Sequence, residues 1–371
     1  MFKVTNQRRK LKTVVVGKAF PPEIFSFIEN SQLRQKFEQL AQETEQDLQG
    51  LCKFMQARGI DVIRPDIDTN METYRLGQGY MSPPISPRDF MCMIDDKMYY
   101  PGLPNKNHAW ADYCKDAKIQ KTQNFESMST AEQSVHREAW KSHEKLDQKM
   151  WNKKIKFFDN IFWEVLNAGN DVVASPIDYF NSSFVTRLDG MLILGTQDYY
   201  DDNDAIHSQW KKMFPDKNIH VKSTEGHSDG VFCPVTDELI VTAFPEVDYS
   251  DIFPKAEVVV VPQEVTLFDD KFKTALHLSE DKWLMPNMEH DKKLVDMVDH
   301  YFSSWVGSVA ESSFMVNILM LDEKNAVCST DNKDVREAMK RHGVELHVVP
   351  FRHKYFWDTG INCLTQDLDR E

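Results

Sequence analysis

The sequence predicts an α/β fold in which ββαβ modules form a ring, with helices on the outside and one site at the centre. Pairs of short strand-like runs are joined by tight turns. A segment with helical spacing and a further strand follow most of these pairs. In a doubly wound parallel sheet each strand would lead directly into a helix, so the pairs argue against that architecture.

The N-terminal part of the chain predicts a strand, a helix and a second strand. Residues 13–16 are a β-branched run, typical of a buried strand. Over residues 33–58 apolar side chains recur at three- and four-residue steps, and Gly59 ends the helix. Residues 61–63 form the next strand, which Pro65 stops.

From residue 90 onward the strand-like runs come mostly in pairs. Asp189-Gly190 is typical of a two-residue hairpin turn, and short polar stretches join the other pairs. The predicted hairpins cover 90–100, 184–194, 231–241 and 315–328, the helices 203–214, 289–306 and 333–342, and the single strands 171–174, 219–222, 258–261, 344–349 and 361–368.

The chain of 371 residues has no low-complexity stretch and no obvious linker. We therefore expect a single domain over residues 1–371. Residues 104–155 are rich in Lys, Gln, His and Glu, and they predict a polar helical insertion on the surface.

Composition and charge narrow the function classes. Acidic side chains exceed basic ones by 58 to 44, so the net charge is −14, which disfavours nucleic acid or an anionic membrane as a partner. The six cysteines show no CxxC pair, as expected in a reducing compartment. No apolar run resembles a signal peptide or approaches the ~20 residues that a membrane helix needs. We expect a cytoplasmic protein.

Four side chains are candidates for chemistry: Cys363, His227, Asp89 and Asp229. Cys363 lies in a short apolar run near the C-terminus, and His227 lies between glycines that let the backbone approach a ligand. A thiol, an imidazole and two carboxylates are the groups needed to attack a guanidinium. Each also has a plain structural interpretation: a buried thiol, a surface histidine, and two turn carboxylates, with Arg88 as a partner for Asp89.

Other catalytic motifs are missing from the sequence. It contains no phosphate-binding loop, no dinucleotide fingerprint and no nucleophile elbow. No second His or Cys lies at ligand spacing from His227. We therefore expect neither a metal nor a cofactor.

Five segments carry a further signal: 11–19, 59–66, Pro87-Arg88-Asp89, 317–324 and 363–367. In this order they resemble motifs of the glycine (arginine:glycine) amidinotransferases, a family of the pentein superfamily. Residues 317–324 are nearly identical to the family's NVLMLDEK. Each motif alone is weak, but five in order from residue 11 to residue 371 are specific.

The resemblance implies a five-bladed pseudosymmetric α/β propeller, the pentein fold. It also implies a transferase that moves the amidino group of arginine to an acceptor amine through a covalent amidino-cysteine and releases ornithine. The expected partners are these small molecules, and a homodimer is left open. The implied roles are nucleophile for Cys363, general acid and base for His227, and guanidinium binding for Asp89 and Asp229, to which we add Arg187 and Ser313 as substrate-binding residues.

Two positions depart from the family pattern. Where the family has FDAAD, whose Asp orients the histidine, this chain has the shorter stretch 180–184, so that Asn181 replaces the Asp or Asp178 substitutes for it. The family also has an Arg downstream of the histidine that contacts a substrate carboxylate. The corresponding region here contains Glu246, which would suit an amine or polyamine acceptor better than glycine.

Two alternative functions stay open at this point. A guanidine hydrolase similar to arginine or agmatine deiminase would use the same residues with water as the acceptor. A non-catalytic guanidinium-binding homologue would keep the fold without the reaction. Product analysis separates the two enzymes, since a transferase yields ornithine and a guanidino compound, whereas arginine hydrolysis yields citrulline and ammonia.

Overall fold

The computed structural model describes residues 1–68, 70–76, 79–101, 129, 153–175, 177, 182–196, 203–224, 227–262, 291–302, 305–306 and 314–371. Within these residues there are five three-stranded sheets and one two-stranded sheet. In each three-stranded sheet an antiparallel pair is extended by a parallel third strand. The same pairing pattern therefore occurs five times, and in four of the five sheets a hairpin joins the antiparallel pair, as the sequence predicts.

Each three-stranded sheet and the crossover that leads to its third strand form one module, and the modules are numbered 1 to 5. The first strand of a module is the outer strand of the antiparallel pair, and it is the strand named first below. Module 1 contains β17 (Thr365–Arg370), β1 (Leu11–Val16) and β2 (Asp61–Ile63); module 2 contains β5 (Cys92–Ile94), β6 (Lys97–Pro101) and β7 (Asp171–Ser175); module 3 contains β8 (Val185–Leu188), β9 (Met191–Thr196) and β10 (Asn218–Ser223); module 4 contains β11 (Phe232–Pro234), β12 (Leu239–Thr242) and β13 (Glu257–Val260); module 5 contains β14 (Leu319–Asp322), β15 (Asn325–Cys328) and β16 (Glu345–Val348); β3 (Arg75–Leu76) and β4 (Gly79–Tyr80) pair separately.

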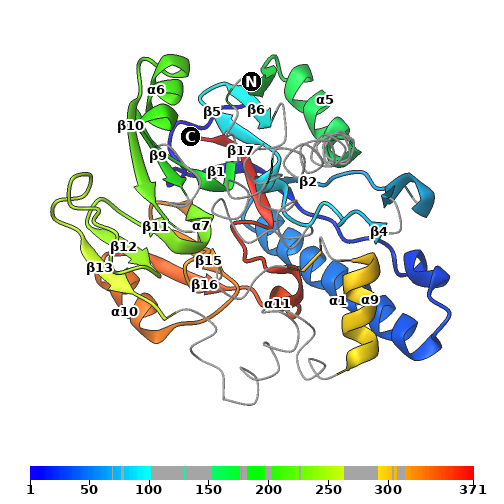
Figure 1. The fold of residues 1–371 in the computed structure, drawn as a ribbon. Helices are drawn as coiled ribbons and strands as arrows, with labels where there is room; N and C mark the ends of the chain where they lie inside the picture. Colours follow the sequence, from blue (N-terminus) through cyan, green and yellow to red (C-terminus); the bar gives the residue numbers. More distant parts are fainter. Residues whose placement is uncertain are drawn as a thin grey trace.

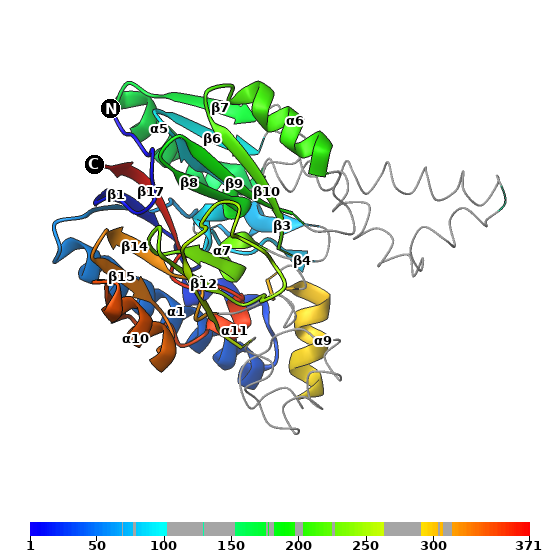
Figure 2. The same cartoon turned by 90° about the vertical axis from the view of Figure 1, so that its left-hand side faces the viewer.

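Module 1 joins the two ends of the chain. Its antiparallel pairing of β17 with β1 runs from Leu11 opposite Arg370 to Val16 opposite Thr365. Figure 2 shows the two termini beside each other, next to these strands. The C-terminal strand thus completes a sheet that the N-terminal strand begins.

Helices provide the crossovers in four modules and lie around the outside of the sheets, with β17 near the middle (Figure 1). In module 4 the crossover at 243–256 consists of turns, and it contains Pro245 and Pro254. The crossover helices are α1 (Ser31–Gln56), α5 (Asp159–Asn167), α6 (Asn203–Met213) and α10 (Lys333–Arg341); the other helices are α7 (Ser228–Val231), α9 (Lys292–Tyr301), α11 (Lys354–Trp357) and the 3-10 helices η1 (Pro22–Phe27), η2 (Met71–Tyr74), η3 (Pro87–Asp89), η4 (Lys156–Phe158) and η5 (Ser182–Phe184).

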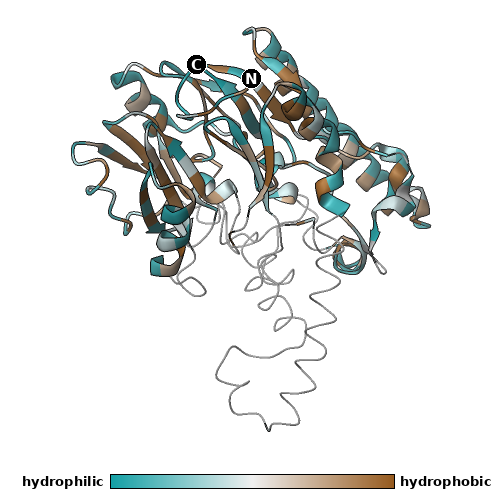
Figure 3. Cartoon of the chain, turned by 90° about the horizontal axis from the view of Figure 1, so that it is seen from above, coloured by the Kyte–Doolittle hydropathy of each residue, from teal (hydrophilic) through white to brown (hydrophobic). Residues whose placement is uncertain are grey.

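The core lies between the sheets and the inner faces of these helices. Helix α1 begins at the side-chain cap of Asn30 and buries Phe37, Leu40, Leu48 and Met55 along one face. Figure 3 shows hydrophobic colour along much of the strands and alternating hydrophilic and hydrophobic stretches along the helices. Hydrophobic burial of this kind is the main favourable term in folding.

A buried cluster of charges lies where first strands of the modules meet. Asp367 of β17 accepts hydrogen bonds from Arg187 of β8 and from Arg370, each at 2.6 Å, and Arg88 of η3 lies 3.5 Å away. Arg187 also donates to the carbonyl of Met93 in β5, and Arg370 donates to a carbonyl of β14. Burial by itself raises the pKa of Asp367. The charges of the three arginines outweigh this effect and hold the pKa well below its usual range. One carboxylate therefore connects four modules.

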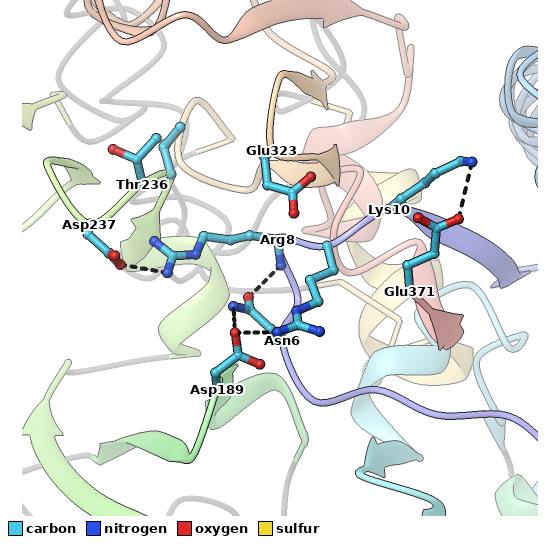
Figure 4. Close-up of a pocket in the computed structure, with 10 residues that line it drawn as sticks. Asn6, Arg8, Lys10, Asp189, Thr236, Asp237, Glu323 and Glu371 are labelled. Carbon is cyan, nitrogen blue, oxygen red and sulfur yellow. Dashed lines mark hydrogen bonds and ion pairs between the residues drawn. The ribbon is translucent and has the colours of Figure 1, made fainter.

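The N-terminal segment closes the end of the modules that lies away from the starts of the first strands. A cavity of about 440 Å³ lies there. Its lining, shown in Figure 4, comes from the N-terminal segment, from the hairpin turns of modules 3, 4 and 5, and from Glu371, which follows β17. Arg8 pairs with Asp237 at 2.6 Å, and Arg9 pairs with Asp189 at 2.9 Å. These contacts are ion pairs within the chain, and they fix the segment across the turns.

Most predicted elements are confirmed, including the long helix, which is α1, and the four hairpins. The strand predicted over 361–368 begins only at Thr365, because residues 361–364 form a turn in which the Leu364 N–H donates to the Gly360 carbonyl. The predicted insertion at 104–155 lies outside the described residues except for Ser129 and residues 153–155. In the described part of the chain, no helix is long and apolar enough to cross a membrane.

Asp367→Asn is expected to destabilise the protein strongly, because it removes the negative charge that three buried guanidinium groups share. Breaking a buried ion pair in this way costs about 3–5 kcal/mol. Urea unfolding would measure the loss. The control is Asp237→Asn, which removes an 81% exposed partner of Arg8 and should cost no more than about 1 kcal/mol. Equal losses in the two variants would contradict the role assigned to Asp367.

Candidate active site

Residues at the starts of the first strands meet at one end of the modules. Asp89 ends η3, just before β5, and His227 and Asp229 lie at the start of α7, just before β11. Asn317 precedes β14, and Cys363 precedes β17. Because each module places its first strand with the same polarity, loops far apart in sequence come together. Four of these five residues are the candidates that the sequence indicates for chemistry.

A cavity of about 300 Å³ lies among these loops. Asp89, His227 and Cys363 all contribute to its wall. Lys154 and the αL residue Asp358 line it as well, together with Trp305 and Trp357, whose rings are stacked 5.5 Å apart. The cavity thus combines charged groups with flat aromatic surfaces, as small-molecule sites commonly do.

The thiol of Cys363 is buried between two polar side chains. Its Sγ lies 3.1 Å from Oδ2 of Asp229, to which it can donate a hydrogen bond. The side-chain amide of Asn317 donates to the same sulfur at 2.8 Å. Only 7% of the residue is exposed. The nucleophile candidate is therefore held by one acceptor and one donor.

Two carboxylate oxygens at this site lack a hydrogen-bond donor. Among the described residues, Oδ1 of Asp89 and Oδ1 of Asp229 are buried and accept no hydrogen bond. The other oxygen of Asp229 accepts from the Asn362 side chain at 3.1 Å and lies 3.9 Å from Nε of Arg88. A buried acceptor without a donor costs about 1–3 kcal/mol. A ligand with several N–H groups and a positive charge would remove that cost.

The imidazole of His227 lies beside Asp89. Its Nδ1 is 3.8 Å from Oδ1 of Asp89, and its ring meets Phe184 edge-on at 5.1 Å between centroids. The imidazole is 39% exposed and reaches the cavity. His227 can therefore exchange a proton with a bound molecule.

While no ligand is bound, the surroundings of the cavity favour the neutral forms of the Cys363 thiol and the Asp89 carboxyl group. Burial raises the pKa of the Cys363 thiol well above its usual range, and the carboxylates of Asp229 and Asp89 raise it further. Burial also raises the pKa of Asp89, an effect that His227 opposes and Asp229 adds to. A cation between the two carboxylates would shift both groups toward their charged forms.

No protein-family model matches the chain, and no curated protein matches its sequence. Among solved structures it is similar to the inosamine-phosphate amidinotransferase StrB1 from Streptomyces griseus, with 15% identity and a TM-score of 0.60 over 100% of this chain and 97% of that one. It is similar to SxtG, an amidinotransferase from Microseira wollei in the saxitoxin biosynthetic pathway, with 13% identity and a TM-score of 0.60 over 100% and 98%. The chain has the pentein fold.

A third structure with this fold is ArgZ, an arginine dihydrolase from the ornithine-ammonia cycle in cyanobacteria. The identity is 11% and the TM-score 0.51, over 97% of this chain and 41% of that one. The five-bladed α/β propeller expected from the sequence is thus confirmed. At these identities the likeness establishes the fold alone.

Not every predicted site residue lies at this end of the pentein fold. Arg187 is 1% exposed and bonded to Asp367, so it is a buried counter-charge and does not line the cavity. Glu246 is exposed in the crossover of module 4 and is not among the described residues that line the cavity. Arg88 donates to the Asn362 carbonyl at 2.8 Å and lies near Asp229 and Asp367, which gives it partners other than Asp89.

Three predicted residues lie outside the described part of the chain: Asn181, Asp178 and Ser313. The group that orients His227 therefore stays a prediction, as does a substrate contact from Ser313. Asn317 was missed, although it opens the segment 317–324 that carries the resemblance. The position of a lone Asn before a strand gives no sign that its amide reaches a cysteine 46 residues later.

Within the described residues, no group of three or more His, Cys, Asp or Glu side chains is arranged to hold a metal ion. The cavity wall instead includes the Cys363 thiol, the His227 imidazole and the Asp89 carboxylate. Asp229 is not among the described residues that line the cavity, but its carboxylate lies 3.1 Å from the sulfur of Cys363. Asp89 and Asp229 each have one oxygen that accepts no hydrogen bond from the described residues. This set suits a planar cation with N–H donors.

Asp229→Asn is expected to make the Cys363 thiol more reactive toward iodoacetamide. The change removes a negative charge 3.1 Å from the sulfur, so the thiol pKa falls and the thiolate fraction rises. One unit of pKa corresponds to about tenfold in rate at neutral pH. Peptide mass spectrometry of Cys363 at several pH values would measure this rate, with Asp237→Asn as the control. A slower reaction in Asp229→Asn would contradict the electrostatic account.

Proposed function

We propose that this protein is an amidinotransferase, which moves the amidino group of arginine to an acceptor amine and releases ornithine. The observation that carries the proposal is the position of the Cys363 sulfur, held by Asp229 and Asn317 at a cavity that Asp89 and His227 also line. The similar structures StrB1 and SxtG, which are titled amidinotransferases, support it.

The two carboxylates bind the guanidinium. Its carbon is a poor electrophile, because resonance spreads the positive charge over three nitrogens. The unfilled Oδ1 atoms of Asp89 and Asp229 accept its N–H groups and hold the plane fixed. The positive charge also offsets the two carboxylates, so the binding of the substrate favours the thiolate of Cys363.

The first half-reaction transfers the amidino group to the enzyme. The sulfur of Cys363 attacks the guanidinium carbon, a C–S bond forms, and the bond from that carbon to Nε of arginine breaks, so that Nε becomes the δ-amino nitrogen of ornithine. His227 carries the proton lost by the thiol to that nitrogen, and neutral ornithine amine leaves. The amidino group then remains on the sulfur as a cation that both carboxylates can still bind.

The second half-reaction reverses these steps with a different amine. The acceptor nitrogen attacks the amidino carbon, His227 removes its proton and returns it to the sulfur, and the C–S bond breaks. Water must be kept from the intermediate, because its attack would hydrolyse the amidino group. Only 7% of Cys363 is exposed, which is consistent with the exclusion of water from the intermediate.

Intact-mass analysis after incubation with arginine tests the reaction. We expect an adduct with the mass of one amidino group and free ornithine, and Cys363→Ala should lose both. A guanidine hydrolase, for which the likeness to the arginine dihydrolase ArgZ is the supporting observation, would instead release ammonia first and keep the rest of arginine on the sulfur. No adduct and no product would favour the non-catalytic guanidinium-binding protein.

Lys154 is proposed to bind the carboxylate of the arginine donor. Its side chain lines the cavity, and its ammonium lies 5.8 Å from the centre of the Phe90 ring, next to Asp89 in the chain. Its charge lowers the pKa of Asp89, which places it within electrostatic reach of the guanidinium site. An amino-acid donor would thus meet acidic groups at one end and a cation at the other.

Lys154→Gln is expected to raise the KM for arginine about tenfold or more, because a hydrogen bond to a charged group contributes about 1.5–3 kcal/mol. The kcat should change little, since the reacting atoms are untouched. Agmatine, which has no carboxylate, should lose much less, because only the effect of Lys154 on Asp89 changes for this donor. Steady-state ornithine or putrescine release measures this, and Lys153→Gln is the neighbouring control. Equal losses for both donors would contradict the assignment.

A further inference from the structure

Asn317 occupies the junction between the nucleophile and the guanidinium-binding carboxylate. Its side chain is buried, at 3% exposure, and both ends of its amide are used. The Oδ1 atom accepts the backbone N–H groups of Asn362 at 2.7 Å and Cys363 at 3.1 Å. The Nδ2 atom donates to the Cys363 sulfur at 2.8 Å and lies 3.3 Å from the backbone carbonyl of Asp229.

These contacts fix the orientation of the amide. If the group were turned over, its NH₂ would face two backbone N–H donors, and its oxygen would face the sulfur and a carbonyl. The orientation with two acceptor contacts at Oδ1 satisfies every group. The N–H of Asn317 therefore points at the sulfur because the backbone on the other side leaves no alternative.

The backbone of the nucleophile loop is shaped to fit this side chain. A Cβ atom at Gly360 would come 2.6 Å from Cβ and Oδ1 of Asn317, closer than such atoms approach. Glycine at this position lets the loop wrap around the amide. The turn then brings Cys363 to the same amide, three residues further on.

We infer that Asn317 is a catalytic residue that stabilises the Cys363 thiolate, a role that rests on the proposed function of Cys363 as nucleophile. The thiolate arises when the guanidinium is attacked and again when the amidino group leaves. Both carboxylates nearby oppose that charge, whereas the amide N–H favours it. A donor held rigidly at the atom where negative charge develops needs no reorganisation during the reaction.

Two variants of Asn317 separate the donor from its surroundings. Asn317→Asp keeps an acceptor for the two backbone N–H groups but removes the donor and adds a charge. Asn317→Ala removes the donor without adding a charge, and Asn317→Leu, which is similar to Asn in shape and has no donor, takes its place if the alanine variant does not fold. The matched control is Asn170→Asp, since Asn170 is also buried and bonded to backbone groups of Phe2 and Asp96, away from the cavity.

The readout is the rate of iodoacetamide modification of Cys363 against pH in the full chain without substrate. We expect the pH midpoint to rise in both Asn317 variants, with at least about tenfold slower modification at pH 8, the factor that one unit of pKa represents. Asn170→Asp should match the wild type. A normal profile in the neutral variant would overturn the inference, even if the Asp variant were slow, because charge alone would explain that.

This measurement is independent of the reaction with arginine. The alkylation profile could shift in the Asn317 variants while the wild type forms no amidino adduct with arginine. In that case Asn317 stabilises the thiolate, but the proposed function is wrong. An adduct with an unshifted profile would support the proposed function and overturn the role of Asn317. In the variants that shift the profile, we also expect slower adduct formation at equal arginine occupancy.

Discussion

The structure depends on one buried carboxylate, that of Asp367. It accepts from two guanidinium groups at 2.6 Å, and Arg88 lies 3.5 Å away as a third. The sheets contribute only short strands, so strand pairing alone would leave the modules free to shift against each other. The cluster fixes them, because each arginine also bonds to the backbone of a neighbouring element. Such an interaction is specific in geometry even where its net contribution to stability is modest.

The same cluster reaches the candidate active site. Arg88 donates to the carbonyl of Asn362, directly before Cys363, and lies 3.9 Å from the carboxylate of Asp229. Three guanidinium groups surround a single carboxylate, so part of their charge is not balanced within the cluster. Asp229 lies next to Arg88, one of the three guanidinium groups that share this excess positive charge. The position of Asp229, which we propose binds the guanidinium, is thus linked to the charge balance of the core.

The sequence was informative about the modules and less so about the contacts between them. Turn pairs such as Asp189-Gly190 and β-branched runs are local signals, so hairpins and strands could be predicted. From the sequence, Arg187 is predicted to be a substrate-binding residue, whereas the structure places it in the buried charge cluster. Its partner Asp367 lies 180 residues away, and only the fold brings the two together. The contact of Asn317 with Cys363 was beyond prediction for the same reason.

A raised thiol pKa does not distinguish Cys363 from the other buried cysteines. Burial raises the pKa of Cys52, Cys92, Cys233 and Cys328 as well, as expected for inert core thiols. What differs is the charge around each sulfur. At each of the other four cysteines an arginine of the chain opposes the rise in pKa and a carboxylate adds to it. At Cys363 the carboxylates of Asp229 and Asp89 both add to the rise, and a cationic ligand would supply the opposing charge. We therefore expect the reactivity of Cys363 to depend on whether the cavity holds a cation, such as the guanidinium of the proposed substrate.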